Sequence, residues 1–176
     1  MRRADDYIKQ IRRKLWIIPA DKRMEILKEM ESDIRERIAN GEREEDIIRE
    51  MPSPNNLREE YVSIYGVSKI YVSFLILIGI SISSLTVSIL PFTSIAFYPA
   101  PLFLILLSIY ILNIAEKYGV KIGAVVSATA SIFRLLLFYL TFFLLQPPLE
   151  PETDMMEILV SLSILLLPFA TYLSKV

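Results

Sequence analysis

Apolar residues follow two different patterns along the chain, and the change falls near residue 67. Before this point they recur at three- and four-residue intervals among charged residues, as in the sequence RMEILKEMESDIRERIA. That spacing predicts amphipathic helices. After this point the apolar residues run together with few charges, which is typical of helices that cross a membrane. We therefore predict an all-α chain, with a small helical domain over residues 1–66 and a transmembrane domain over residues 67–176.

The predicted transmembrane domain contains four apolar runs, at about residues 70–90, 95–115, 122–145 and 155–173. Each run is close to the ~20 residues that a helix needs to cross ~30 Å of hydrocarbon. We expect four spanning helices that pack as a bundle in the lipid bilayer.

Basic residues near the apolar runs predict the orientation of the chain. Lys117 and Lys121 lie between the second and third runs and Lys175 follows the fourth, whereas the connections after the first and third runs contain no base. Basic residues concentrate on the cytoplasmic side of a membrane. We expect a multi-pass protein of the cell membrane with both termini in the cytoplasm. The N-terminal sequence also lacks the apolar core of a signal peptide, so we expect no cleavage.

Composition narrows the chemistry that the chain can perform. It contains no cysteine and no histidine, which excludes disulfides, thiolate metal sites and histidine-based acid–base catalysis. The formal net charge of −1 gives no basic excess of the kind that nucleic-acid binding requires. The sequence also shows no phosphate-binding loop and no nucleophile motif. We therefore expect neither an enzyme nor a cofactor, metal or nucleic-acid partner.

Small residues mark a packing face on the third run. Gly123, Ser127 and Ser131 recur every four residues, a spacing that lets two membrane helices approach closely. We interpret this face as packing within the bundle, with association of two copies of the chain as the other reading.

Arg134 is a single charge near the middle of the third run. A central arginine costs roughly 2.5–3.5 kcal/mol on insertion scales, and it usually faces a partner or a wet cavity. Three readings are open. Arg134 forms hydrogen bonds within the bundle, or it binds an acidic residue of another membrane protein. In the third reading the Arg134 side chain snorkels, so that its guanidinium reaches the membrane–water interface. We expect Arg134, with Asn113 as a polar neighbour, to mark an intramembrane contact.

The carboxylates of the chain are expected to lie away from Arg134. Glu157 is expected near the outer end of the fourth run, where Asp154 and Glu157 are spaced like a helix capping box. Glu116 and Asn113 are expected towards the inner side. The sequence thus predicts no carboxylate of the chain at the depth of Arg134.

The first 66 residues predict several short helices, the last of which starts at Ser53 and Pro54, a typical N-cap and first-turn pair. The first helix is basic: residues 1–23 carry a net charge of +5 and residues 24–69 a net charge of −5. Basic residues either neutralise acidic neighbours or contact anionic lipids of the inner leaflet. Trp16 either enters the lipid interface or fills a buried corner. The candidate lipid-contact residues are Arg2, Arg3, Lys9, Arg12, Arg13, Lys14 and Trp16.

The stretch YIKQIRRKLWIIPADKRMEILKEMESDIRERIANGEREEDIIREMPSPNNLREEY resembles the HAAS domain, a helical signalling module found in front of membrane spans. The matching landmarks are Leu15 and Pro19, the helix RMEILKEMESDIRE, the segment ANGEREEDII, and a proline-initiated helix with LREEY. The usual Gly-Asp-Pro punctuation of the family is replaced here by Pro52-Ser53-Pro54. The resemblance covers about the first 65 residues.

The resemblance implies regulation by protein contact, often in systems with PadR-like transcription factors, and it carries no catalytic residues. We therefore expect an integral membrane signalling or regulatory protein that acts through contacts of its cytoplasmic helical domain with a protein partner. An accessory or structural subunit of a larger membrane complex is the alternative, and a small transporter or channel is the third reading. Association of the chain with itself is also open.

Overall fold

The computed structural model describes the backbone of residues 2–87, 99–145 and 151–173, with the side chains of residues 2, 3, 99, 145, 151–154, 172 and 173 left undescribed. The predicted segments at 88–90 and 95–98 lie outside the described residues. The chain divides into two compact units, Met1–Tyr71 and Val72–Val176. Every regular element in the described ranges is a helix, which confirms the all-α prediction.

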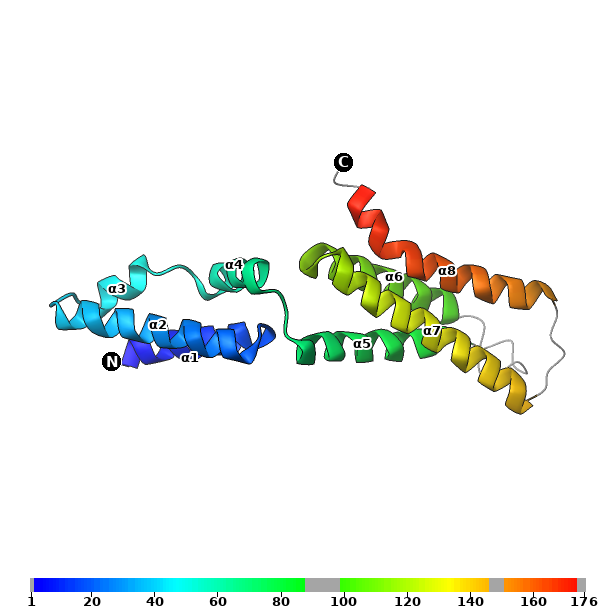
Figure 1. The fold of residues 1–176 in the computed structure, drawn as a ribbon, viewed down its shortest axis with the longest axis horizontal. Coiled ribbons are helices and arrows are strands. Elements are labelled where there is room, and N and C mark those ends of the chain that lie inside the picture. The colour runs from blue at the N-terminus through cyan, green and yellow to red at the C-terminus, as the bar shows by residue number, and fades with distance from the viewer. Residues whose placement is uncertain (1, 88–98, 146–150, 174–176) are drawn as a thin grey trace. The chain divides into compact units, whose positions relative to one another are not determined.

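The N-terminal unit contains four α-helices and one short 3₁₀ helix (Figure 1). They are α1 (Arg2–Lys14), η1 (Leu15–Ile17), α2 (Ala20–Ala39), α3 (Glu44–Glu50) and α4 (Pro54–Tyr65). Helix α1 packs against the other three α-helices of the unit. The predicted start of α4 is confirmed, because the side chain of Ser53 accepts a hydrogen bond from the Asn56 N–H and Pro54 occupies the first turn.

The core of the N-terminal unit is apolar and contains residues from all four of its α-helices. Ile11, Leu15 and Ile47 are fully buried in it. The Tyr7 hydroxyl donates a hydrogen bond to the carbonyl of Pro52 over 2.7 Å and so ties α1 to the segment before α4. The N–H of Ala4 donates to the Glu44 carboxylate over 2.7 Å, which joins α1 to α3 in the same way. The unit is therefore closed around α1 by apolar packing and by two long-range hydrogen bonds.

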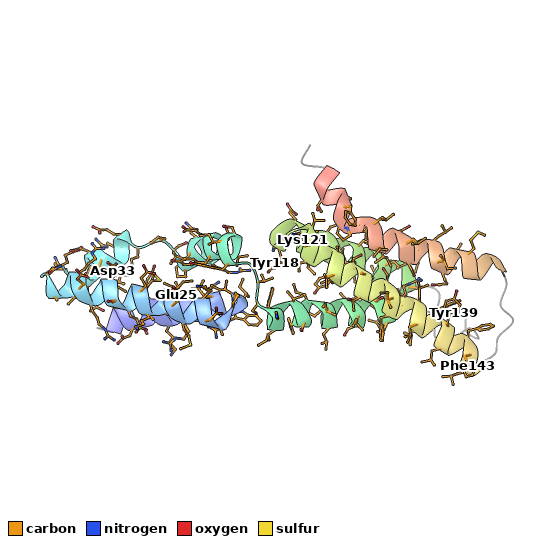
Figure 2. The ribbon with its side chains drawn as sticks, viewed as in Figure 1. Glu25, Asp33, Tyr118, Lys121, Tyr139 and Phe143 are labelled. Atoms are coloured by element: carbon orange, nitrogen blue, oxygen red, sulfur yellow. The ribbon has the colours of Figure 1, made fainter. Side chains whose placement is uncertain are left out.

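The C-terminal unit consists of apolar helices. They are α5 (Lys69–Ser84), which begins in the N-terminal unit, α6 (Pro99–Tyr118), α7 (Val120–Leu145) and α8 (Pro151–Leu173). Helices α6, α7 and α8 all contact one another (Figure 1). Helices α6 and α7 are joined through Gly119, whose φ of +94° suits glycine and reverses the chain between Tyr118 and Lys121 (Figure 2).

By length and composition, α6 and α7 can each cross a membrane, and a third crossing requires α4 and α5 to be counted as one bent span. Helix α5 alone has 16 residues, because it ends at Ser84 and residues 85–86 form a turn. The sequence predicted one continuous run to residue 90. In α8 the apolar stretch Met155–Thr171 is shorter than a full span. The count is thus two or three by this measure, and the predicted count of four is not confirmed.

Many large apolar side chains of α6 and α7 point outward. Tyr139 and Phe143 project from the C-terminal half of α7 (Figure 2), and both are exposed. The small core of this unit contains Leu107, Ile111, Ala130 and Ile164. The apolar unit therefore carries much of its apolar surface on the outside.

Candidate functional site

The site that the sequence singled out is the arginine of α7. Arg134 is 2% exposed, so its guanidinium lies among the helices and not at the surface of the unit. Its Nε donates a hydrogen bond to Thr86 Oγ1 over 2.9 Å. Its Nη1 donates to Ser161 Oγ over 3.0 Å and to the backbone carbonyl of Glu157 over 3.2 Å. One side chain therefore connects the turn after α5 with α7 and α8.

The charge of Arg134 is neutralised by a carboxylate of its own chain. Arg134 Nη2 lies 2.5 Å from Glu157 Oε2. The prediction that Glu157 is a poor partner is therefore wrong, and so is the prediction that no carboxylate reaches the depth of Arg134. The reason is the start of α8. This helix begins at Pro151 and not near Met155, so Glu157 lies in its second turn and points inward.

Further buried hydroxyl groups connect the same helices as the ion pair. Ser83 Oγ donates to the carbonyl of Ala130 over 2.9 Å, which joins α5 to α7. Ser127 Oγ donates to the carbonyl of Ile164 over 2.5 Å, which joins α7 to α8. Both serines are fully buried, and neighbouring Ser131 is buried without a hydrogen-bond partner. We call the set of Arg134, Glu157, Thr86, Ser83, Ser127, Ser131 and Ser161 the polar cluster.

The other predicted intramembrane residues separate into two groups. Asn113 is exposed, and its amide donates to the carbonyl of Ile109 in its own helix over 2.8 Å, so it does not join Arg134. Gly123 faces α6, where an added Cβ would lie 2.7 Å from the Cβ of Ala115. Ser127 and Ser131 are buried and belong to the polar cluster.

Sequence reasoning missed Thr86 and Ser161 as members of the cluster. Ser161 follows Glu157 by four residues, a spacing that places both on one face of a helix, so this signal was present. Thr86 lies in the turn after α5, where no helical periodicity points to it. Its hydroxyl also donates to the carbonyl of Ser83 over 2.6 Å, and this bond aims the oxygen at Arg134.

The polar cluster joins helices and offers little for chemistry. The donors of Arg134 are directed at Thr86, Ser161 and Glu157, and the charges of the pair cancel. Among the described residues, no group of three or more histidine, cysteine, aspartate or glutamate side chains is placed to hold a metal ion. An ion pair held between packed helices is best known for fixing the register of the elements that carry it.

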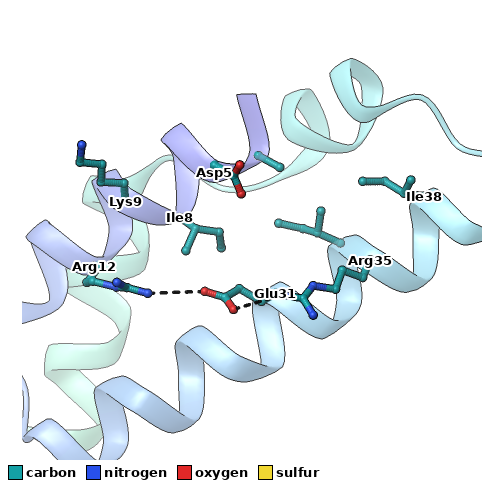
Figure 3. Close-up of a pocket in the computed structure, with 9 residues that line it drawn as sticks. Asp5, Ile8, Lys9, Arg12, Glu31, Arg35 and Ile38 are labelled. Carbon is teal, nitrogen blue, oxygen red and sulfur yellow. Dashed lines mark ion pairs between the residues drawn. The ribbon is translucent and has the colours of Figure 1, made fainter. Parts of the chain in front are cut away.

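A second candidate site is a groove in the N-terminal unit between α1 and α2 (Figure 3). Its volume is about 710 Å³, and its floor is made by Ile8, Ile34 and Ile38. On the rim, Glu31 lies between two arginines, 3.6 Å from Arg12 and 3.9 Å from Arg35. The groove therefore combines an apolar floor with a rim that carries both signs of charge.

The comparison with known families concerns this N-terminal unit. The HAAS family model matches residues 6–60. These residues form a HAAS domain. The match confirms the resemblance predicted from the sequence, and it covers α2, α3 and most of α1 and α4. No curated protein and no solved structure matches the chain.

The predicted lipid-contact residues of the HAAS domain are spread over different surfaces. Lys9 and Arg12 line the α1–α2 groove, while Arg13 and Lys14 are exposed elsewhere on α1. The side chains of Arg2 and Arg3 lie outside the described residues. Ile17 and Ile18 fill a buried corner after α1, but Trp16 beside them is 48% exposed.

One charged group on the surface of the HAAS domain links α2 to α3. Arg37 Nη2 lies 2.5 Å from carboxylate oxygens of both Glu42 and Glu50. The hydrogen bonds from Arg37 lower the pKa of Glu42 below its ordinary value and raise the pKa of Arg37 further above its own. Burial inside the same domain raises the pKa of Tyr7 and of Tyr61. At this helix junction Arg37 thus favours the ionised form of Glu42.

Proposed function

We propose that the chain is an integral membrane protein whose HAAS domain regulates another protein by direct contact. The observation that carries this proposal is the joining of a HAAS domain, closed around its own core, to a helical unit that exposes its apolar side chains. The first part offers a surface for a partner in water, and the second has the surface of a membrane protein.

The distribution of apolar side chains supports insertion into a bilayer. Exposed residues on α6 and α7 include Leu102, Ile105, Leu106, Ile109, Val125, Ile132, Leu136, Leu140 and Phe143. Soluble monomers rarely expose contiguous apolar patches of more than a few hundred Å². In lipid the same side chains match their surroundings, and the paired Arg134 is where an intramembrane charge belongs, inside the bundle.

The number of crossings and the orientation are proposed on the basis of the sequence. We propose four spans in the cell membrane, with both termini and the HAAS domain in the cytoplasm, because the bases of the apolar half lie on one side of alternate runs. A 16-residue α5 is ~24 Å long and would span a thinned bilayer.

The α1–α2 groove supports contact with a protein. An apolar floor under a charged rim is the composition of protein interfaces, where a dry centre is enclosed by polar groups. The rim carries three bases and two acids, a mixture of both signs that suits the polar edge of a protein contact. We propose that the HAAS domain acts without catalysis and without a cofactor.

In the alternative role, as a subunit of a larger complex, Arg134 would bind another membrane protein of that complex. Arg134 is instead buried and paired within its own chain, so this observation no longer favours that role. The transporter reading likewise gains no support from a neutral pair whose donors are in use.

The experiment is a native purification of the full chain with quantitative mass spectrometry. We expect a soluble protein to co-purify with the chain. Arg35→Glu on the groove rim should reduce the amount of this protein. Arg49→Glu on α3, the same change of charge at an exposed site away from the groove, should leave that amount unchanged. Retention of all partners after removal of residues 1–65 would contradict the proposal. So would membrane subunits in fixed ratio to the chain, because they would indicate the accessory role.

A further inference from the structure

A cluster of exposed apolar side chains lies at one end of the N-terminal unit. Met24 at the start of α2 is 70% exposed, and Ile64 and Tyr65 at the end of α4 are also exposed. Trp16 of η1 and Ile70 in the first turn of α5 complete the set. We call these five residues the corner patch. Large apolar side chains that gather at one end of a small domain mark a contact surface.

The corner patch is fixed to the first residues of α5 by contacts within the same unit. The N–H of Ser68 donates a hydrogen bond to the carbonyl of Ile17 over 2.7 Å. The ring of Trp16 meets the ring of Tyr71 edge to face, with 5.1 Å between the ring centres. The distance from Trp16 to the point where the apolar run begins is therefore set by packing and not by a free linker.

Basic groups lie among the apolar side chains of the corner patch. Lys22 Nζ is 5.7 Å from the ring centre of Tyr65, and it also pairs with Glu25 over 2.8 Å. Arg23 Nη1 lies 3.5 Å from the carbonyl of Trp16. Lys69 is exposed at the start of α5. Tryptophan, tyrosine, lysine and arginine thus occur together where the chain passes into its apolar half.

We infer that the corner patch lies in the phospholipid headgroup region and holds the HAAS domain against the membrane surface. This inference rests on the proposed insertion of the apolar helices. Amphipathic aromatic rings are enriched at the headgroup level, and basic residues beside them gain from anionic lipid. The charges exclude a deeper position in hydrocarbon. Continuity with α5 favours lipid over a protein partner, because Ile70 and Tyr71 enter the bilayer from this end.

This surface differs from the one that the sequence predicted. The basic face of α1 was the candidate for lipid contact, but Lys9 and Arg12 line the groove and Arg12 is paired with Glu31. Trp16 is the member of that predicted set that belongs to the corner patch. The basic residues that the structure places at the corner patch, Lys22 beside Tyr65 and Arg23 beside the Trp16 carbonyl, come from α2.

Trp16 is the single tryptophan of the chain, so its fluorescence reports on the corner patch without mutation. The test uses the full chain in vesicles of phosphatidylcholine and phosphatidylglycerol that carry a nitroxide either at the headgroup or in the middle of the acyl chain. We expect the headgroup nitroxide to quench Trp16 at least ~2-fold more strongly than the acyl-chain nitroxide. Iodide added to the water phase serves as a third quencher. Quenching by iodide alone would show that Trp16 faces water, and quenching by neither nitroxide nor iodide would show that it faces a protein. Either result would overturn the inference.

A second probe separates this inference from the proposed function. The chain has no cysteine, so a fluorophore on Leu136→Cys labels one exposed position of α7. Quenching of that label by the acyl-chain nitroxide with no lipid quenching of Trp16 would refute the corner patch and retain the membrane protein. Absence of lipid quenching at both positions would refute the membrane insertion itself.

Matched variants test which residues hold the contact. Met24→Glu adds one negative charge to the corner patch, and Ser32→Glu adds the same charge at an exposed position two turns further along α2. We expect Met24→Glu to lower the headgroup quenching of Trp16 by ~2-fold, because it places a carboxylate against anionic lipid, and Ser32→Glu to leave it unchanged. Equal quenching in the two variants would contradict the inference.

Discussion

The HAAS domain and the apolar unit of this chain bury opposite kinds of side chain. In the HAAS domain, Ile11, Leu15 and Ile47 are fully buried while ion pairs such as Arg12–Glu31 lie on the surface. In the apolar unit, Arg134 and hydroxyl groups are buried while leucine, isoleucine and phenylalanine cover the outside. This difference agrees with the surroundings proposed for each part, water for the HAAS domain and lipid for the apolar unit.

Replacing the buried arginine is expected to have the largest effect. Arg134→Leu leaves the carboxylate of Glu157 without its partner, and breaking a buried ion pair from one side costs roughly 3–5 kcal/mol. The free energy of unfolding of the full chain in mixed micelles measures this loss.

The double variant Arg134→Leu/Glu157→Leu sharpens the result. It leaves no unpaired charge, so we expect it to be more stable than Arg134→Leu alone. Arg49→Leu serves as the control, since Arg49 is exposed, and surface changes of this kind usually fall within about 0.5 kcal/mol. A double variant as unstable as the single one would show that the pair itself is not what stabilises the packing.

Truncating a side chain in the core of the HAAS domain is expected to have the second-largest effect on stability. Ile11→Ala removes three carbon atoms from a fully buried site and should cost roughly 2–5 kcal/mol, all of it in the N-terminal unit. Hydrogen exchange of the full chain should accelerate in α1–α4 and stay unchanged in α6 and α7. Ile38→Ala, at a residue that is 38% exposed, is the matched control with a smaller effect. Faster exchange in α6 and α7 as well would contradict the expectation that the loss is confined to the N-terminal unit.

A methyl group added between α6 and α7 is expected to have a moderate effect. In Gly123→Ala the new Cβ would lie 2.7 Å from the Cβ and 3.0 Å from the backbone Cα of Ala115, so the α6 backbone has to move, and overpacking of this kind costs about 1–3 kcal/mol. In Gly79→Ala the nearest atom, also at 3.0 Å, is the side-chain Cγ1 of Val126. We expect Gly123→Ala to be the more destabilising in micelles, and the reverse order would contradict the close approach of the two helices.

The surface ion pairs of the HAAS domain are expected to have the smallest effect. The folded state lowers the pKa of Glu42 below its ordinary value of 4.5 through hydrogen bonds from Arg37. Its contribution is therefore present above the pKa of the unfolded chain and is lost as the pH falls through the lower, folded value.

Carboxyl NMR of the full chain tests the shift directly. Glu42 should titrate below its ordinary value, and Arg37→Gln should return it towards that value. A Glu42 titration that is unchanged by the loss of Arg37 would contradict the assignment of cause.

Local sequence signals predicted much of the HAAS domain correctly. Apolar periodicity predicted its helices, and the Ser53–Pro54 pair placed the start of α4, because these features act over a few residues. The Arg134–Glu157 pair was not predictable in this way. It depended on α8 starting at Pro151, and a four-residue error in a helix start placed Glu157 at the wrong depth. Thr86 was missed because it lies in a turn, where position follows from packing across the unit.

The most direct test of the account is the environment of introduced nitroxides in the full chain, which has no native cysteine. Single labels at Ile105→Cys on α6, Leu136→Cys on α7 and Arg49→Cys in the HAAS domain all occupy exposed positions. We predict that oxygen, which concentrates in lipid, relaxes the first two labels, and that a water-soluble nickel complex relaxes the third. Strong relaxation of the labels at positions 105 and 136 by the nickel complex would contradict the account, because those faces would then lie in water.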